Sequence, residues 1–90
     1  MLKIQITKRV YKFLGKLPLK HALQLKNKLL SLQANPFPPD SKSLIGYPDY
    51  YRATAGEYRI VYRIENNTLL VPLIGKRNDG EVYKKLNQIL

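Results

Sequence analysis

The sequence contains no cysteine and few acidic residues, with 6 Asp and Glu against 16 Lys and Arg in 90 residues. The absence of cysteine excludes disulfide bonds, thiolate zinc sites and a thiol nucleophile. The scarcity of acids leaves a formal net charge of +10 at pH 7. Such a charge attracts polyanions, which include nucleic acid, a ribosome, an acidic protein and an anionic membrane surface. Charge alone does not select among these partners.

Long hydrophobic runs are also missing. The longest apolar stretch, residues 69–75, is too short to span a bilayer, and the N-terminal MLKIQITKRV lacks the hydrophobic segment of a signal peptide. We therefore expect a cytoplasmic protein with no membrane partner. Because 44% of the residues are hydrophobic, the chain can bury enough apolar surface to fold. Its length predicts a single domain over residues 1–90.

The motifs of cofactor enzymes are absent, since the chain has neither a phosphate-binding loop nor a GxGxxG sequence. Its one histidine, His21, has no Asp or second His at the spacing of metal ligands. The sequence therefore predicts no metal site and no cofactor. His21 lies among lysines near the start of a predicted helix, and we interpret it as a surface residue.

The N-terminal half predicts one strand and two helices. Leu2, Ile4 and Ile6 alternate with polar residues, which is typical of a strand with one buried face. Apolar residues then recur at helical spacing from a cap at Thr7 to residue 17, and again from Pro18 to about residue 32. The two helices should pack as a hairpin. The proline-rich sequence NPFPPDSK, residues 35–42, predicts a loop.

The C-terminal half predicts three strands joined by tight turns, over residues 50–54, 57–65 and 68–76. Ala55-Gly56 and Asn66-Asn67 supply the turns, and Pro72 indicates an edge or a bulge in the last strand. Residues 81–90 predict a short final helix. The fold class is therefore α+β, in which the helical hairpin packs on a small antiparallel sheet in the order βααβββ, followed by the C-terminal helix.

The alternation within residues 57–65 places Tyr58 and Tyr62 on the core face and Arg59 and Arg63 on the other. If Arg52, Arg59 and Arg77 converge, their guanidinium groups can hold phosphate oxygens and remain charged at any physiological pH. The alternative is that these arginines are ordinary surface residues, or pair with the nearby acids Glu57, Glu65 and Asp79.

Cleavage of RNA without a metal needs a base, an acid and cations for the charge that develops on phosphate. With histidine scarce, a tyrosine or a lysine must supply the proton transfers. Tyr83 follows the polar turn NDGE, and the charges of Lys76 and Arg77 would favour its phenolate by lowering its pKa. The interleaved tyrosines and arginines are also typical of single-stranded RNA recognition.

Two segments, PDYYRATAGEYRIVYRI and LIGKRNDGEVYKKL, resemble the RelE/ParE superfamily of toxins from type II toxin–antitoxin pairs, and specifically its RelE branch. The resemblance implies the fold of microbial ribonucleases, with a helical hairpin packed on a small antiparallel sheet. It also implies an mRNA interferase, an endoribonuclease that cuts mRNA in the ribosomal A site by 2′-hydroxyl attack, without metal.

Carried over by motif, the resemblance assigns catalytic roles to Arg59 of GEYR, Arg77 of GKR and Tyr83 of EVY. The two arginines would neutralise the scissile phosphate, while Tyr83 would orient or deprotonate the 2′-hydroxyl. Arg52 and Lys76 would bind RNA phosphates. The chain departs from the RelE pattern at Thr54, where a lysine is expected, and at Arg52, which replaces a lysine that could exchange protons.

The resemblance also implies partners. A cognate antitoxin, acidic and partly disordered, would cover the arginines or displace the final helix together with Tyr83. Operator DNA would be bound only through the antitoxin complex. Two other functions stay open, namely a ParE-like inhibitor of DNA gyrase and a degenerate toxin that acts only as a binding module.

Overall fold

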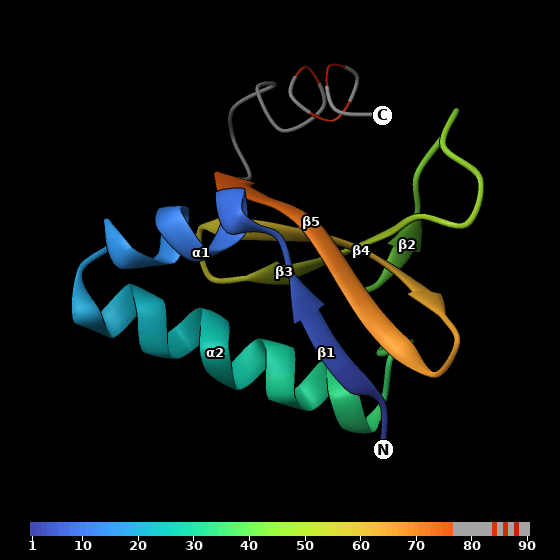
Figure 1. Cartoon of the computed structure of the whole chain (residues 1–90), viewed down its shortest axis with the longest axis horizontal. Coiled ribbons are helices and arrows are strands. Elements are labelled where there is room, and N and C mark those ends of the chain that lie inside the picture. The colour runs from blue at the N-terminus through green and yellow to red at the C-terminus, as the bar shows by residue number, and fades with distance from the viewer. Residues whose placement is uncertain (77–83, 85, 87, 89–90) are drawn as a thin grey trace.

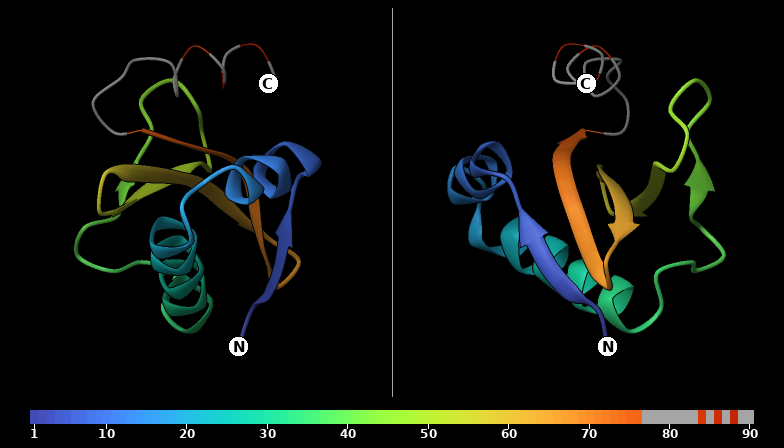
Figure 2. Two further views of the ribbon diagram at one scale, coloured as in Figure 1. Left: turned by 90° about the vertical axis from the view of Figure 1, so that its left-hand side faces the viewer. Right: turned by 45° about the vertical axis from the view of Figure 1, so that its right-hand side comes forward.

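A computed structural model describes residues 1–76, 84, 86 and 88 of the chain. Strand β1 (Lys3–Ile6) leads into a hairpin of two helices, α1 (Lys8–Gly15) and α2 (Leu19–Ala34). The remaining strands are β2 (Lys42–Ser43), β3 (Tyr51–Ala55), β4 (Tyr58–Glu65) and β5 (Thr68–Lys76). Figures 1 and 2 show both helices on the same side of the sheet. The architecture is α+β, as the sequence predicts.

Helix α1 begins at Thr7, whose hydroxyl accepts a hydrogen bond from the backbone N–H of Val10 at 3.2 Å. This contact satisfies one of the free donors in the first turn and confirms the predicted cap. Val10 is fully buried, and Phe13 contacts the Tyr58 ring edge-to-face with 6.0 Å between centroids. The apolar side of α1 therefore fixes the helix against the sheet.

The charges of α1 affect its stability in opposite directions. Its first turn contains Lys8 and Arg9 but no acidic residue, so positive charge lies at the positive end of the helix dipole. Lys8, Lys12 and the C-cap residue Lys16 also follow one another at i,i+4 spacing, where like charges cost roughly 0.2–0.5 kcal/mol per pair. Lys12 and Lys16 lie at the C-terminal end of α1, where the helix dipole favours cations. Packing of the apolar side against β5 offsets these costs.

The main core lies between the helices and the sheet. Helix α2 contributes Leu25, Leu29 and Leu32, all of them buried. The sheet contributes alternate residues of β3, β4 and β5, namely Ala53, Ala55, Tyr58, Ile60, Tyr62, Leu69, Val71 and Ile74. Tyr62 is fully buried, and its hydroxyl donates a hydrogen bond of 2.6 Å to the Pro36 carbonyl. The predicted core positions of Tyr58 and Tyr62 are confirmed.

The five strands are arranged in the order β1-β5-β4-β3-β2. Strands β2 to β5 are antiparallel, but β1 pairs with β5 in parallel. The prediction of a purely antiparallel sheet was therefore wrong at β1. The helical hairpin carries the chain across one face of the sheet before β2, so that β5 returns beside β1 in the same direction. Alternation within one strand gives no information on the direction of its partner.

Strand β2 was not predicted, because two residues are too few to show a period. Lys42 pairs with Arg52 and Ser43 with Tyr51, directly after the proline-rich loop. The turn at Asn66-Asn67 is confirmed, since both residues have positive φ, 51° and 58°, as a type I′ hairpin turn requires. Of the predicted final helix, Lys84, Leu86 and Gln88 are helical, and its other residues lie outside the described part of the chain.

Strand β5 contains the irregularity that Pro72 indicates. Val61 pairs with Leu73, whereas Arg63 pairs with Leu70, so β5 uses one residue more than β4 over this stretch. Proline cannot donate to the ladder and is tolerated at such a bulge. The Pro72 carbonyl instead accepts a hydrogen bond of 3.2 Å from the Thr7 hydroxyl, which ties the start of α1 to β5.

Candidate functional site

The face of the sheet that points away from the helices carries the candidate site. Residues that lie opposite one another on neighbouring strands share a face, so the pairings arrange this face in rows across β3, β4 and β5. The first row is formed by Thr54, Arg59 and Gly75. Arg59 is half-buried, and its neighbour on β5 has no side chain.

The second row contains Arg52, Val61 and Leu73. Val61 is fully buried and Leu73 is 2% exposed, because they form a second hydrophobic cluster with Leu44 and Leu86. The face is thus only partly cationic, since an apolar centre separates its charged ends. Sequence reasoning missed this cluster, because Leu44 and Leu86 are distant in the chain from the strand that they cover.

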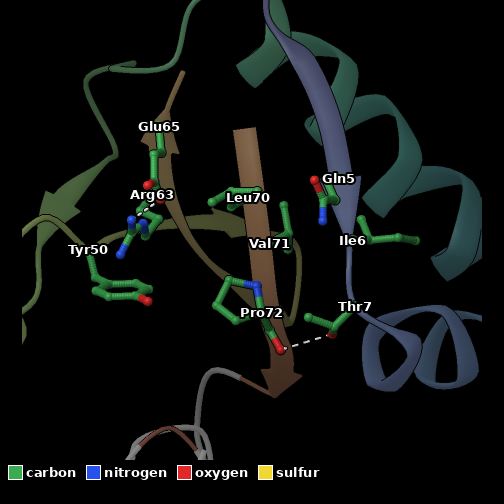
Figure 3. A pocket seen from close by; sticks show the side chains of 9 residues that line it. All are labelled: Gln5, Ile6, Thr7, Tyr50, Arg63, Glu65, Leu70, Val71 and Pro72. Carbon is green, nitrogen blue, oxygen red and sulfur yellow. Dashed lines mark hydrogen bonds and ion pairs between the residues drawn. The ribbon is translucent and has the colours of Figure 1, made fainter. Parts of the chain in front are cut away.

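The third row places Arg63 opposite Leu70, beside a groove of about 360 Å³. Figure 3 shows Tyr50, Arg63 and Glu65 along one wall of this groove, and Gln5 and Thr7 along the other. The Arg63 guanidinium lies 5.6 Å from the centroid of the Tyr50 ring and forms an ion pair with Glu65. Hydrogen bonds to Tyr50 and Glu65 raise the pKa of Arg63. For this arginine, pairing with a nearby acid is the correct interpretation.

The structure brings Arg52 and Arg59 together on one face of the sheet. Arg52 pairs with Val61 and Arg59 pairs with Thr54, so the two arginines are diagonal neighbours across β3 and β4. Diagonal neighbours lie roughly 7–8 Å apart, within reach of long side chains. Both arginines are half-buried. The two guanidinium groups can therefore approach the same anion or two successive anions.

The register separates Lys76 from these arginines. Lys76 pairs with Tyr58, whose ring belongs to the core on the helix side, whereas Arg59 pairs with Gly75 on the opposite face. Lys76 is exposed at the end of β5. It therefore extends the charge of the helix side and does not stand beside Arg59 in the same row.

Arg77 and Tyr83 lie outside the described residues, and their predicted catalytic roles stay predictions. Two described residues bound them in the sequence, namely Lys76, the last residue of β5, and Lys84, which is helical and exposed. Beyond them, Leu86 is fully buried against Val61 and Leu73. The C-terminal segment is therefore anchored at Leu86 on the same face as Arg52 and Arg59.

Asp40 supports this site from the edge of the sheet, and sequence reasoning missed it. Its carboxylate accepts a hydrogen bond of 3.1 Å from the backbone N–H of Thr54 and forms an ion pair of 3.1 Å with Lys28. Partial burial raises the pKa of Asp40, but the hydrogen bonds from Thr54 and Lys28 outweigh it and lower the pKa below its ordinary value of 3.8. Asp40 thereby holds the end of β3 that carries Thr54.

The interpretation of His21 as a surface residue was wrong. His21 is half-buried, and its Nδ1 lies 2.8 Å from the Tyr58 hydroxyl in a hydrogen bond between α2 and β4. Its contact is visible only once the helix is folded on the sheet. Among residues 1–76, 84, 86 and 88, no three His, Asp or Glu residues gather as metal ligands would. No helix in this part of the chain has the length and apolar character to span a membrane.

The chain is similar to known toxins in sequence and in fold. A family model described as the ParE toxin of the type II toxin–antitoxin system parDE matches residues 4–80. The structure of the isolated RelE toxin of E. coli is 28% identical, with a TM-score of 0.74 and 100% of both chains covered. A mutant E. coli RelE in the free state is 29% identical, with a TM-score of 0.79, and 99% of this chain and 98% of that chain are covered.

An archaeal RelE–RelB complex from Pyrococcus horikoshii OT3 is also similar. Its matching chain is 28% identical, with a TM-score of 0.75, and 84% of this chain and 94% of that chain are covered. A search of curated protein sequences gave no match. The solved relatives therefore include toxin structures determined both alone and in complex with an antitoxin.

Proposed function

This chain belongs to the ParE toxin family of type II toxin–antitoxin systems and has the fold of RelE toxins, and from that premise we propose that it is a metal-independent endoribonuclease. Its substrate is mRNA in the ribosomal A site, and it acts in the cytoplasm. The observation that carries the proposal is the pair Arg52 and Arg59 on the face away from the helices, with Gly75 beside Arg59.

The reaction is attack of a ribose 2′-hydroxyl on the adjacent phosphorus. A bond forms between the 2′-oxygen and phosphorus, the bond to the 5′-oxygen breaks, and a proton moves from the former oxygen to the latter by way of acid and base groups. Negative charge increases on the phosphate oxygens in the transition state. A fixed guanidinium at that position stabilises the transition state more than it stabilises the ground state, which is the condition for catalysis.

Arg59 is the residue best placed for this role. It lies between Thr54 on β3 and Gly75 on β5, which has no side chain. Arg52 stands one row further along and holds the next phosphate or a second oxygen of the same one. Arg77 acts as the second catalytic arginine, Tyr83 orients or deprotonates the 2′-hydroxyl, and Lys76 binds RNA outside this row.

Single-turnover cleavage of mRNA on purified ribosomes tests this function. We expect Arg59→Ala to slow cleavage at saturating toxin by roughly 100-fold or more, the usual cost of removing one donor to a developing oxyanion. Arg63→Ala is the matched control, because it removes an arginine from the same strand and face that already pairs with Glu65. Equal rates for wild type and Arg59→Ala, with intact folds, would overturn the assignment.

We propose a cognate antitoxin as the partner that controls the toxin. Relatives have been crystallised with RelB antitoxins, among them the archaeal complex. The net charge of +10 favours an acidic and partly disordered segment that folds on binding. Operator DNA is bound only through the complex. The antitoxin inhibits either by covering Arg52 and Arg59 or by displacing the C-terminal segment anchored at Leu86.

A second candidate function is inhibition of DNA gyrase, which the match to a ParE family model favours. The two activities are separated by one experiment, in which the purified chain is added to a gyrase supercoiling assay and to translating ribosomes. Loss of supercoiling with intact mRNA would replace the ribonuclease by a gyrase inhibitor. No effect in either assay would leave the third function, a degenerate toxin that acts only by binding.

A further inference from the structure

Helix α1 carries a row of cations that the proposed catalytic site does not use. Lys8, Arg9, Lys12 and Lys16 are all exposed, and together with Phe13 they line a shallow hollow of about 440 Å³. We propose that this surface, the α1 cation row, binds the phosphate backbone of ribosomal RNA outside the segment that is cleaved. The proposal concerns affinity and not chemistry, so it adds an anchoring surface to the proposed function.

The charge around this row has one sign. Residues 1–39 contain eight Lys and Arg but no Asp or Glu. Within residues 1–76, the ion pairs of the structure join Lys28 to Asp40 and Arg63 to Glu65. The four cations of α1 therefore have no acidic partner in the described part of the chain, and their field is directed to solvent.

Part of the row is unfavourable for the isolated fold. Lys8 and Arg9 occupy the first turn of α1, where the helix dipole disfavours cations, and Lys8, Lys12 and the C-cap residue Lys16 repel one another at i,i+4 spacing. The dipole favours Lys12 and Lys16 at the other end of the helix. None of these side chains makes a compensating contact in the described residues. A local arrangement that opposes the fold without internal compensation is typical of a functional surface. A bound polyanion would remove the repulsion.

The chemistry of the row fits nucleic acid better than protein. Protein interfaces have an apolar core with few lysines, whereas interfaces with nucleic acid are polar and strongly positive. The hollow contains one apolar residue, Phe13, whose ring is half-buried against Tyr58. Helical geometry repeats the lysines about every 6 Å, which suits a chain of regularly spaced negative charges. The occupant is therefore an RNA backbone.

The position of the row is consistent with this role. The Phe13 ring contacts Tyr58, and Tyr58 precedes Arg59 and pairs with the exposed Lys76. The row and Lys76 thus flank the end of the sheet where Arg59 stands on the opposite face. The start of α1 lies against β5, where the Thr7 hydroxyl donates a hydrogen bond to the Pro72 carbonyl. RNA held by α1 would lie next to the cleaved segment without competing for Arg59.

The test is equilibrium binding of ribosomes over a series of KCl concentrations. We expect Lys8→Gln/Lys12→Gln to weaken binding about tenfold at physiological salt and to reduce the slope of log K against log salt by about 0.7 to 0.9 per lost phosphate contact. The matched control is Lys3→Gln/Lys26→Gln, which removes the same charge from exposed lysines outside α1. Cleavage at saturating concentration should be unchanged in both variants.

Thermal unfolding distinguishes a loss of binding from a loss of folding. Because the substitutions remove like charges from α1, the melting temperature of Lys8→Gln/Lys12→Gln should equal or exceed that of wild type. Equal affinities and salt slopes for the two double variants would overturn the proposal. The proposal would also be overturned if Lys8→Gln/Lys12→Gln lost binding to polyglutamate, an acidic peptide probe, but kept its binding to ribosomes. If wild type binds ribosomes through α1 but leaves mRNA intact, the surface is supported and the proposed nuclease function fails.

Discussion

Thr54 is the residue at which this chain departs most clearly from the RelE pattern. It pairs with Arg59 across β3 and β4, so a side chain at position 54 lies directly beside the proposed catalytic arginine. The hydroxyl of threonine carries no charge and cannot act as an ammonium acid. Arg52, which also replaces a lysine, stays protonated at any physiological pH. At positions 52 and 54, the sheet face that carries Arg59 therefore has no group that gives up a proton at physiological pH.

We expect Thr54→Lys to accelerate cleavage. A lysine opposite Arg59 would restore a group able to give a proton to the leaving 5′-oxygen, and a positioned acid or base contributes typically 10²–10⁴-fold. Because Thr54 is half-buried at the sheet edge, part of this gain should be lost to imperfect placement, and we expect at least tenfold. Single-turnover kinetics on ribosomes measure it, with Thr54→Gln as the uncharged control of similar length. Equal rates for the two variants would contradict the account.

At the scale of elements, Asp40 connects the proline-rich loop to β3 and to α2. Its pKa is lower in the folded chain than the ordinary value of 3.8, so the folded state favours the carboxylate. The stability that this gives is complete above the unfolded pKa and is lost as pH falls through the lower folded pKa. The side chain of Asp40 is 41% exposed, which limits the gain to less than about 1 kcal/mol.

We therefore expect Asp40→Asn to lower the free energy of unfolding at pH 7 and to have a smaller effect at pH 3. Urea unfolding of both proteins at the two pH values measures this difference. Asp49→Asn is the control, because the structure gives Asp49 a positive φ but no ion pair among the described residues. A difference between wild type and Asp40→Asn that grows on acidification would contradict the argument.

Leu86 connects the C-terminal segment to the sheet. Its side chain is fully buried against Val61 and Leu73, near the rows that carry Arg52 and Arg59. We expect Leu86→Ala to reduce cleavage more than tenfold, because the truncated side chain no longer holds the segment that contains Tyr83. The melting temperature should also fall, since truncation of a buried leucine costs about 2–5 kcal/mol.

The matched variant for this prediction is Lys84→Ala, which alters an exposed residue of the same helical segment. Cleavage rates are compared at a temperature where both variants are folded. A Leu86→Ala protein that cleaves as fast as Lys84→Ala would show that the anchor is unrelated to the site.

Most elements of the fold were predictable from local pattern. The alternation in β4, the cap at Thr7 and the Asn66-Asn67 turn each depend on a few neighbouring residues, and all three are confirmed. The parallel pairing of β1 with β5 and the strand β2 were not predictable, because they depend on contacts between distant segments. Local sequence determines the elements, while the register between them requires the folded chain.

The same distinction applies to the candidate site. Alternation alone placed Arg59 on the face away from the core, and the structure adds Arg52 as its diagonal neighbour. Alternation could not show that Asp40 binds the N–H of Thr54 or that Leu86 covers Val61. Each of these contacts depends on a loop or a tail that brings distant residues together.

On the scale of the whole molecule, the two sides of the sheet carry different groups of residues. The helix side contains the main core and, on its outer surface, the α1 cation row. The other side carries Arg52 and Arg59 around a small apolar cluster. A chain with net charge +10 can therefore contact RNA with both sides, and the side with the arginines is the one where cleavage is proposed.

The measurement that tests the central claim most directly is induction of this chain in cells, followed by primer extension on several transcripts during active translation. Wild type is compared with Arg59→Ala, and with Arg77→Ala as the second predicted arginine. We expect growth arrest with cuts inside translated reading frames for wild type, and loss of those cuts in Arg59→Ala. Growth arrest without cuts, or cuts that persist in Arg59→Ala, would contradict the proposed function.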